Sequence, residues 1–419
     1  MKDKQIEKLI KQEEVRQKKT ISLIASENYV SYDVLKALGS KFTNKYSEGY
    51  PGHRYYKGQT FTDKVELLCQ ERALKLFGLT GKPLDSARGN SPMANWHVNV
   101  QALSGSPANL AVYLALVPKG EKVMGMSLNH GGHLTHGHKV SATGKIWNAV
   151  QYGVNPDTEV LDYEEIKKIA IAEKPKMIIA GYTAYPRVVD FKKFREIADA
   201  VVHPEPGRRT ILMVDMSHFA GLVAGGVYPS PFPYADVVTT TVHKTLRGPR
   251  SALIFSRRDR TQTSAKGNEI SFSDLIDKAI FPGLQGGPHM NQISAVAVAL
   301  KEASTPAFKK YAKQVVKNAK VLAEELNKLG WKIISGGTDT HLILVDTFMN
   351  GAGMSGDEAS NRLEKEGIIV NKNTIPNETR SPMDPSGIRL GTAGETTRGA
   401  KERDMLLLAR KIDKILRKK

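Results

Sequence analysis

A lysine in the middle of the chain could carry nucleophilic chemistry. Residues 242–250 read VHKTLRGPR and directly follow the strand-like run 237–241. A lysine lodged there beside other positive groups can lose its proton and attack a carbonyl carbon as a Schiff-base nucleophile. The alternative is a solvent-facing lysine with no chemical task. Its place at the edge where open α/β sheets bind ligands makes Lys244 a candidate lysine for binding pyridoxal phosphate.

A carboxylate ends the apolar run 211–214, which precedes the strand-like run 237–241. Residues 214–219 read VDMSHF, and Asp215 follows the strand-like residues 211–214. Such an aspartate could simply cap the next helix. A pyridoxal phosphate site, however, needs a carboxylate that keeps the pyridinium nitrogen protonated, so that the ring can act as an electron sink. Asp215 could supply that carboxylate from a strand next to the one before Lys244.

The segment SGSPAN, residues 104–109, precedes the helical run 110–116. Taken alone, it is most simply an ordinary helix N-cap. A phosphate group there would gain from the helix N-terminus and its free backbone N–H groups. The chain has no GxGxxG after a strand and no GxxxxGK[ST], so the usual loop of a dinucleotide or nucleoside-triphosphate site is missing.

Four histidines fall within residues 130–138, in the sequence HGGHLTHGH. Zinc is the obvious alternative, because imidazole is a common zinc ligand. The glycines indicate a loop, no HExxH is present, and no carboxylate is interleaved. A histidine ring stacked on a planar cofactor accounts better for the glycines, so no metal is predicted.

The composition restricts the class of protein. The chain has 419 residues, 40% of them hydrophobic, and 61 Lys and Arg against 43 Asp and Glu, a net charge of +18. This excess raises a nucleic-acid-binding protein as an alternative. The basic residues are spread out, however, with Lys309, Lys313 and Lys317 on the expected solvent face of an amphipathic helix. One cysteine, no signal peptide and no long apolar run predict a cytoplasmic protein without membrane or nucleic-acid partners.

Short apolar runs alternate with helical patterns, which predicts an α/β domain with a largely parallel sheet. The pattern changes near residue 290 to an α+β arrangement. We therefore predict a helical arm (1–30), a large cofactor domain (31–290) and a small C-terminal domain (291–419). The expected strands are 123–128, 177–182, 211–215, 237–241, 252–255, 332–334 and 342–345, and the expected helices are 62–77, 163–173, 191–201, 290–303, 307–329, 356–366 and 401–416.

Together these segments resemble one family, the serine hydroxymethyltransferases, over about residues 20 to 410. The resemblance implies the aspartate-aminotransferase-like fold (fold type I) and pyridoxal phosphate as cofactor. It also implies reversible conversion of L-serine and tetrahydrofolate to glycine and 5,10-methylenetetrahydrofolate, in a homodimer with shared active sites or a tetramer. The matching segments are SLIASENYVS, NKYSEGYPGHRYY, SGSPAN, NHGGHLTHG, VDMSHFAGL, HKTLRGPR, FPGLQGGPH and SGIRLGT.

The resemblance also implies a role for individual residues. Lys244 would form the Schiff base, Asp215 would pair with the ring nitrogen, and His133 would stack on the ring. Glu48 would be the acid and base on the serine hydroxyl and the folate. The other catalytic residues would be His218, Thr241 and His243. The other cofactor contacts would be Ser104, Gly105 and Ser106 to the phosphate, with Thr183, and Tyr46 and Gly287 from the partner chain.

Substrate contacts follow from the same resemblance. Arg389, with Ser26 and Tyr56, would hold the amino acid's carboxylate, a task that suits the bidentate guanidinium. Tyr55 would come from the partner chain with Tyr46, Glu48 and Tyr56. Leu128 and Leu134 could equally be ordinary core residues. The residues of the implied folate pocket are Leu128, Gly132, Leu134, Asn373, Ser381 and Met383.

Some positions depart from the family pattern. Val242, Lys57 and Leu284 replace a threonine and two glycines, and the segment 82–95 is longer than is usual there. None touches the lysine, the ring aspartate or the carboxylate arginine, so the predicted reaction class is unchanged. A folate-independent threonine or allothreonine aldolase of the same fold is the main alternative function.

Overall fold

The structure is a computed structural model that describes residues 1–80, 95–205, 207–263 and 267–418. The segment 82–95, expected to be unusually long, lies outside the described residues except for its last residue. The chain divides by its internal contacts into residues 30–313 and a second unit of residues 1–29 and 314–419. Contacts within a unit do not establish independent folding, so the domain boundaries at 30 and 290 stay a prediction.

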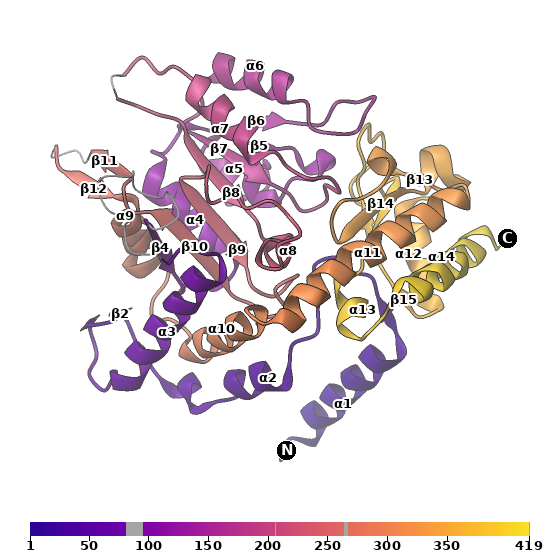
Figure 1. Cartoon of the computed structure of the whole chain (residues 1–419), viewed down its shortest axis with the longest axis horizontal. Helices are drawn as coiled ribbons and strands as arrows, with labels where there is room; N and C mark the ends of the chain where they lie inside the picture. The colour runs from indigo at the N-terminus through magenta and orange to yellow at the C-terminus, as the bar shows by residue number, and fades with distance from the viewer. Residues whose placement is uncertain (81–94, 206, 264–266, 419) are drawn as a thin grey trace. The chain divides into compact units, whose positions relative to one another are not determined.

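The unit of residues 30–313 is built on a seven-stranded sheet in the order β4-β10-β9-β8-β7-β5-β6 (Figure 1). Strands β6, β5, β7, β8 and β9 pair in parallel, and β10 is antiparallel to both β9 and β4. The carboxyl ends of the central strands are therefore at one edge. The strands are β4 (Trp96–Asn99), β5 (Lys122–Met126), β6 (Asn148–Tyr152), β7 (Met177–Gly181), β8 (Ile211–Asp215), β9 (Val237–Thr241) and β10 (Ala252–Arg257).

Both faces of this sheet are buried, which explains the unbroken apolar runs of its central strands. Met177, Met213 and Val237 point to one face and share a core with helix α4. The alternating residues Ile178 and Leu212 are equally buried on the other face, since side chains alternate along a strand. The helices of this unit include α2 (Tyr32–Leu38), α3 (Thr60–Leu76), α4 (Gly105–Leu116), α5 (Ala142–Ile146), α6 (Tyr163–Glu173), α7 (Phe191–Ala200), α8 (Ala220–Ala224), α9 (Phe272–Lys278) and α10 (Met290–Ala303).

The second unit holds a four-stranded antiparallel sheet in the order β13-β14-β17-β16. Helix α14 (Glu402–Arg417) buries Met405, Leu408, Ala409 and Ile412, which recur at helical spacing along one face. The strands are β13 (Lys332–Ile333), β14 (Leu342–Asp346), β16 (Asn371–Asn373) and β17 (Gly387–Gly391), and the other helices are α1 (Lys4–Lys19), the C-terminal part of α11 (Pro306–Lys328), α12 (Gly356–Lys365) and α13 (Ala393–Thr397).

The shorter elements complete the chain. Two-stranded sheets pair β1 with β15, β2 with β3, and β11 with β12. In the described part of the chain, no helix has the length and apolar character that a membrane span needs. The strands of these small sheets are β1 (Ile21–Ser22), β15 (Ile368–Ile369), β2 (Gly49–Tyr50), β3 (His53–Arg54), β11 (Thr261–Thr263) and β12 (Glu269–Ser271).

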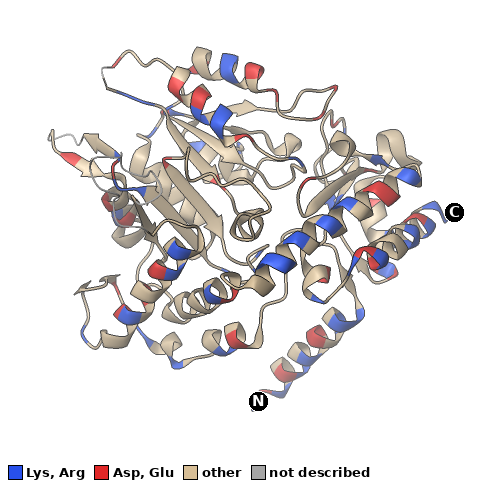
Figure 2. Cartoon of the chain, viewed as in Figure 1, with Lys and Arg blue, Asp and Glu red and all other residues tan. Residues whose placement is uncertain are grey.

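The predicted fold class is confirmed: a large α/β unit with a mainly parallel sheet accompanies a smaller α+β unit. The expected solvent face of α11 is also present, since Lys309, Lys313 and Lys317 are exposed while Val315 is buried. Figure 2 shows Lys and Arg interleaved with Asp and Glu on α1 and α14, whereas on α11 most of the lysines precede the acidic residues, which lie near its C-terminal end.

Candidate active site

Lys244 lies in the turn that follows β9. Its Nζ donates a hydrogen bond to Thr241 Oγ1 over 2.9 Å. The turn is closed by backbone hydrogen bonds from Arg247 N to Lys244 O and from Gly248 N to Val242 O. Lys244 and Thr241 are therefore brought together, as the sequence predicted for two residues of one site.

Asp215 ends β8 with a buried carboxylate that accepts three hydrogen bonds. Oδ2 accepts from Asn109 Nδ2 at 2.9 Å and from His136 Nε2 at 3.2 Å, and Oδ1 accepts from Ser217 N at 3.0 Å. Burial alone would raise the pKa of Asp215, but the hydrogen bond and charge of His136, with the donors of Ser217 and Asn109, outweigh it and lower the pKa well below its usual range. Asp215 is thus kept ionised inside the fold.

His136 was missed by the sequence analysis as a functional residue. Its Nδ1 accepts from the backbone N–H of His133, which leaves Nε2 to carry the proton that reaches Asp215. The signal was present in the sequence, because His136 follows His133 by three residues in the glycine-rich HGGHLTHG segment. Spacing alone could not show which of the four histidines would meet the aspartate.

His133 is held at the same place by the next residues of its loop. Its Nδ1 lies 2.7 Å from Thr135 Oγ1 and accepts from Thr135 N at 3.2 Å. Thr135 Oγ1 in turn accepts from Asn109 Nδ2, the group that also donates to Asp215. Through Thr135 and Asn109, the predicted stacking histidine and the predicted ring aspartate belong to one hydrogen-bonded group.

The N-terminus of α4 offers unused donors beside this group. Ser104 is the N-cap residue of α4, as the simple interpretation of the segment predicted, but its side chain makes no capping hydrogen bond. Pro107 has no N–H, which leaves Gly105 and Ser106 as the donors of the first turn. A Cβ on Gly105 would lie 2.8 Å from Thr241 Cγ2, so this glycine lets α4 approach the end of β9.

The remaining links join these parts into a single site. Asp215 pairs in register with Thr239 of β9, and Thr241 N donates to Ser217 Oγ at 3.0 Å. The predicted residues His218 and Thr183 lie in the loops that follow β8 and β7. His218 is buried and its carbonyl accepts from Thr245 Oγ1, while Thr183 N donates to Gly131 O.

His243 is a partly buried histidine whose buried Nδ1 atom has no hydrogen-bond partner among the described residues. Burial, followed by the positive charges of Lys244 and Arg250, lowers the pKa of His243 to about 3. The ring is therefore neutral at physiological pH, with one polar atom left for a group outside the protein.

This donor set fits pyridoxal phosphate. An ionised buried carboxylate suits a protonated ring nitrogen, a helix N-terminus without a side-chain cap suits a phosphate, and the Lys244 amine follows the neighbouring strand β9. Within the described residues, no cluster of three or more His, Cys, Asp or Glu side chains is arranged to hold a metal ion.

A second group of predicted residues forms an exposed aromatic cluster in the same unit. The rings of Tyr46 and Tyr56 lie 5.3 Å apart, and those of Tyr55 and Tyr56 lie 5.2 Å apart. The charge of Glu48, and its hydrogen bond to the hydroxyl, raise the pKa of Tyr46. A Cβ on Gly287 would touch the Tyr46 ring at 3.6 Å. The five residues expected from a partner chain therefore gather on one surface.

Two of the residues expected to contact folate in this unit are not core residues. Leu134 is exposed and Leu128 is partly buried, so the alternative of an ordinary core position is wrong for both. Gly132 permits a tight backbone approach, because a Cβ there would meet Met126 O at 1.9 Å.

Arg389 lies on β17 of the second unit and is 94% buried, with 6% of its surface exposed. Its Nε donates to Asn371 Oδ1 at 3.0 Å, and burial lowers its pKa to about 10, so it stays cationic at neutral pH. Gly391 N donates to Leu23 O, which brings the Ser26 segment to the same strand. Asn373 ends β16, and Ser381 and Met383 lie in the loop before β17, where Met383 N donates to Ser381 Oγ.

Comparison with known proteins matches the chain to the serine hydroxymethyltransferase family model over residues 1–412. The serine hydroxymethyltransferase of Desulfotalea psychrophila (strain LSv54 / DSM 12343) is 52% identical over 414 residues, covering 99% of this chain and 88% of the relative. That of Koribacter versatilis (strain Ellin345) is 51% identical over 403 residues, covering 96% of this chain and 86% of the relative.

Proposed function

Because the chain belongs to the serine hydroxymethyltransferase family, we propose that it is a glycine hydroxymethyltransferase whose site is built around Lys244 and Asp215. It converts L-serine and tetrahydrofolate to glycine and 5,10-methylenetetrahydrofolate, in the reverse direction as well, and serves one-carbon metabolism and glycine biosynthesis. The observation that carries the proposal is the ionised, triply hydrogen-bonded Asp215 beside the lysine turn. We place the enzyme in the cytoplasm.

Bound pyridoxal phosphate supplies an electron sink for the negative charge that develops on the amino acid's α-carbon. Asp215, held ionised by His136, would keep a proton on the ring nitrogen. The backbone N–H groups of Gly105 and Ser106 and the Ser104 hydroxyl would hold the phosphate. His133 would contact the ring, and Thr183 and His218 would contact its phenolic oxygen.

Lys244 would provide the amine that holds the cofactor. Its Nζ donates a hydrogen bond to Thr241 Oγ1, so this hydroxyl would orient the amine when it is not bonded to the cofactor. His243 stays neutral beside it, which avoids a second positive charge next to the lysine. Thr241 would thus orient the Lys244 amine, and the neutral His243 would add no positive charge beside it.

Arg389 would bind the serine carboxylate with its remaining guanidinium donors, assisted by Ser26 and Tyr56. A buried cation is costly to leave uncompensated, so a substrate carboxylate is favoured at such a site. The pterin and its tail would contact Leu128, Gly132, Leu134, Asn373, Ser381 and Met383. The partial exposure of Leu128 and Leu134 supports a ligand-contacting role.

Glu48 would transfer protons at the serine hydroxyl and the folate, from the aromatic cluster of a partner subunit. Exposed apolar side chains in each unit support a homodimer. In the second unit, helix α1 buries none of its residues, and Ile6, Leu9 and Ile10 are exposed along it. In the unit of residues 30–313, the exposed apolar residues of α2 and α3 are Tyr32, Leu35, Phe61, Leu67 and Leu68. A partner that covers the surface of α2 and α3 would contribute Tyr46, Glu48, Tyr55, Tyr56 and Gly287 to the neighbouring site; tetramers would be pairs of such dimers.

Turnover of serine with and without tetrahydrofolate tests the function. Folate-dependent release of the one-carbon unit, lost in Lys244→Ala together with the yellow colour of the protein, is expected. Equal cleavage of allothreonine and serine without any folate requirement would instead indicate the aldolase.

Mixing two inactive variants tests the shared sites. Lys244→Ala and Glu48→Gln dimers, exchanged together, should recover about a quarter of the native activity, because half the dimers are hybrids and each hybrid has one intact site of two. Recovery of no activity after verified subunit exchange would contradict sites shared between subunits.

A further inference from the structure

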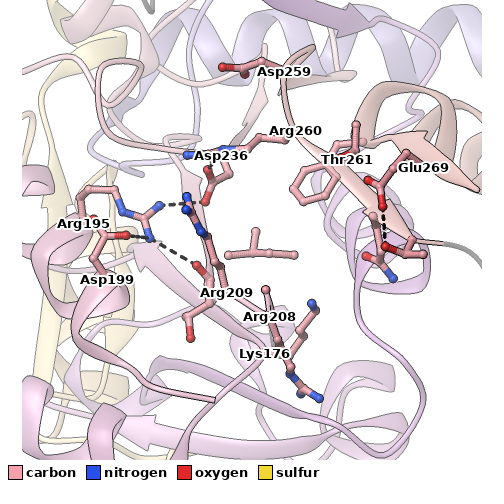
Figure 3. A pocket seen from close by; sticks show the side chains of 16 residues that line it. Lys176, Arg195, Asp199, Arg208, Arg209, Asp236, Asp259, Arg260, Thr261 and Glu269 are labelled. Atoms are coloured by element: carbon pink, nitrogen blue, oxygen red, sulfur yellow. Dashed lines mark hydrogen bonds and ion pairs between the residues drawn. The ribbon is translucent and has the colours of Figure 1, made fainter. Parts of the chain in front are cut away.

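A second cavity lies at the amino edge of the seven-stranded sheet (Figure 3). Its volume is about 580 Å³, and Lys176, Thr210 and Asp236 in its wall directly precede β7, β8 and β9. The Lys244 site is at the other ends of these strands. Five residues at about 3.3 Å each separate the two edges by roughly 16 Å. The cavity is therefore distinct from the candidate active site.

The carboxylates of this cavity are already engaged. The Asp236 carboxylate forms ion pairs with Arg195, at 2.9 Å from Nη1 to Oδ2, and with Arg260, at 2.8 Å from Nε to Oδ1. Asp199 receives Arg195 Nη2 at 2.9 Å, and Asp259 pairs with Arg257, which does not line the cavity. The fourth carboxylate of the lining, Glu269, accepts a hydrogen bond from Thr263 Oγ1 and has no ion-pair partner among the described residues. Three of the four lining carboxylates are therefore paired with arginines.

Two cationic side chains that line the cavity have no carboxylate partner in the described part of the chain. Lys176 and Arg209 line the cavity, and neither side chain has a carboxylate within ion-pair distance among the described residues. Figure 3 shows Lys176 and Arg208 on one wall, with Arg209 facing the same space. Burial, and next the charge of Arg208, lower the pKa of Lys176, so an anion would stabilise its ammonium.

Buried polar atoms around the cavity are also left without partners. Arg195 Nε and Arg208 Nε, and the acceptor Gln262 Oε1, make no hydrogen bond with any described residue. Buried donors and acceptors are normally satisfied, so each such atom asks for a partner from outside the chain. Donors here outnumber acceptors, which indicates an anionic ligand.

We propose that this amino-edge cavity binds a phosphorylated small organic molecule, of the class of nucleotides and sugar phosphates. Guanidinium and ammonium groups bind phosphate oxygens with charge-assisted hydrogen bonds. The volume is that of a small-molecule site, and Ile211 and Phe272 add apolar contacts for an organic part.

Calorimetric titration of the holoenzyme tests this site independently of catalysis. Pyridoxal phosphate first occupies the Lys244 site and its excess is removed; ATP without magnesium, ribose 5-phosphate and inorganic phosphate are then titrated at constant ionic strength. One saturable site per chain is expected for ATP or ribose 5-phosphate, with inorganic phosphate binding at least tenfold more weakly.

Matched variants locate the site. Arg209→Gln and Lys176→Gln should each weaken the binding about tenfold, the value of one charge-assisted contact. Lys310→Gln, an exposed lysine outside the cavity, should bind as the native protein does. Serine turnover of Arg209→Gln should stay within about twofold of native, so a failed proposal here leaves the active-site assignment intact.

Four results would overturn the proposal. They are an absence of saturable binding of ATP and of ribose 5-phosphate, equal affinities in all variants, inorganic phosphate binding as tightly as the organic phosphates, and a single-stranded oligonucleotide competing for the same residues. An unchanged melting temperature of Arg209→Gln establishes that a loss of binding is not unfolding.

Discussion

Two buried aspartates, at opposite edges of the same sheet, have opposite electrostatic surroundings. Asp215 at the carboxyl edge is 6% exposed and is held by an asparagine, a backbone N–H and a histidine. Asp236 at the amino edge is 4% exposed and is held by two arginines and the backbone N–H of Leu212. The Asp236 charge is neutralised within the fold, whereas the Asp215 group keeps an anion available for a cationic ligand atom. The arrangement around Asp236 serves stability, and the arrangement around Asp215 serves chemistry.

The largest effect is expected from Asp215→Asn. Loss of the carboxylate removes the group that keeps the ring nitrogen protonated, so kcat should fall about 10³-fold, or ~4 kcal/mol of transition-state stabilisation. Turnover of the pyridoxal-phosphate-saturated protein measures it. Native activity in this variant would contradict a chemical role for the Asp215 carboxylate.

Asp236→Asn should act on stability instead. Two guanidinium groups would be left without their buried carboxylate, which costs about 3 kcal/mol of unfolding free energy. Urea denaturation measures this loss, while kcat per folded molecule should change by less than about threefold. A variant as stable as the native protein but catalytically impaired would reverse the two assignments.

His136→Leu should have an intermediate effect through Asp215. Without the Nε2 donor, kcat should fall about tenfold, as for other residues that orient a reactive group. The pKa of Asp215 is lowered in the fold, so the stability from its ionisation is present above about pH 4 and is lost as the pH falls through the folded pKa. In His136→Leu the folded pKa of Asp215 should rise toward its unfolded value, so the loss of stability on acidification should be smaller and complete at a higher pH.

His136→Gln is the matched control, because its amide can still donate to Asp215. Partial recovery of kcat together with a return of the acid transition toward the native pH is expected. Identical behaviour of the leucine and glutamine variants would mean that His136 only fills space.

The smallest effect concerns His243, whose pKa is lowered to about 3. The unfolded chain takes up a proton there near pH 6.5 and the folded chain does not, so stability falls with pH below that value, by at most about 1.4 kcal/mol per unit. Denaturation at pH 7, 6 and 5 should show the native protein losing stability faster than His243→Asn. The same dependence of stability on pH in the native protein and in His243→Asn would contradict a His243 ring that stays neutral in the fold.

The fold was predictable where burial is complete. Residues 211–215 and 237–241 form β8 and β9 as expected, because strands buried on both faces read as unbroken apolar runs. The edge strand β6, with largely exposed side chains, left no such signal. The reversed direction of β10 was equally hidden, since an apolar run does not encode strand direction.

The candidate site was predictable in its residue types but not in its connections. Lys244, Asp215 and Ser104 follow recognisable patterns at strand and helix ends. The donation from His136 to Asp215 depends on a loop conformation that joins segments 79 residues apart. The cation-rich cavity at the amino edge was not expected at all, because Lys176, Arg209 and Arg260 come from separate loops and look like ordinary surface charges in the sequence.

The central claim is that Lys244 holds the cofactor at the carboxyl edge of the sheet. Borohydride reduction of the holoenzyme, followed by peptide mapping with mass spectrometry, tests it most directly. The account predicts one phosphopyridoxyl group per chain, on Lys244. Labelling of another lysine instead, or no labelling of a protein saturated with pyridoxal phosphate, would contradict it.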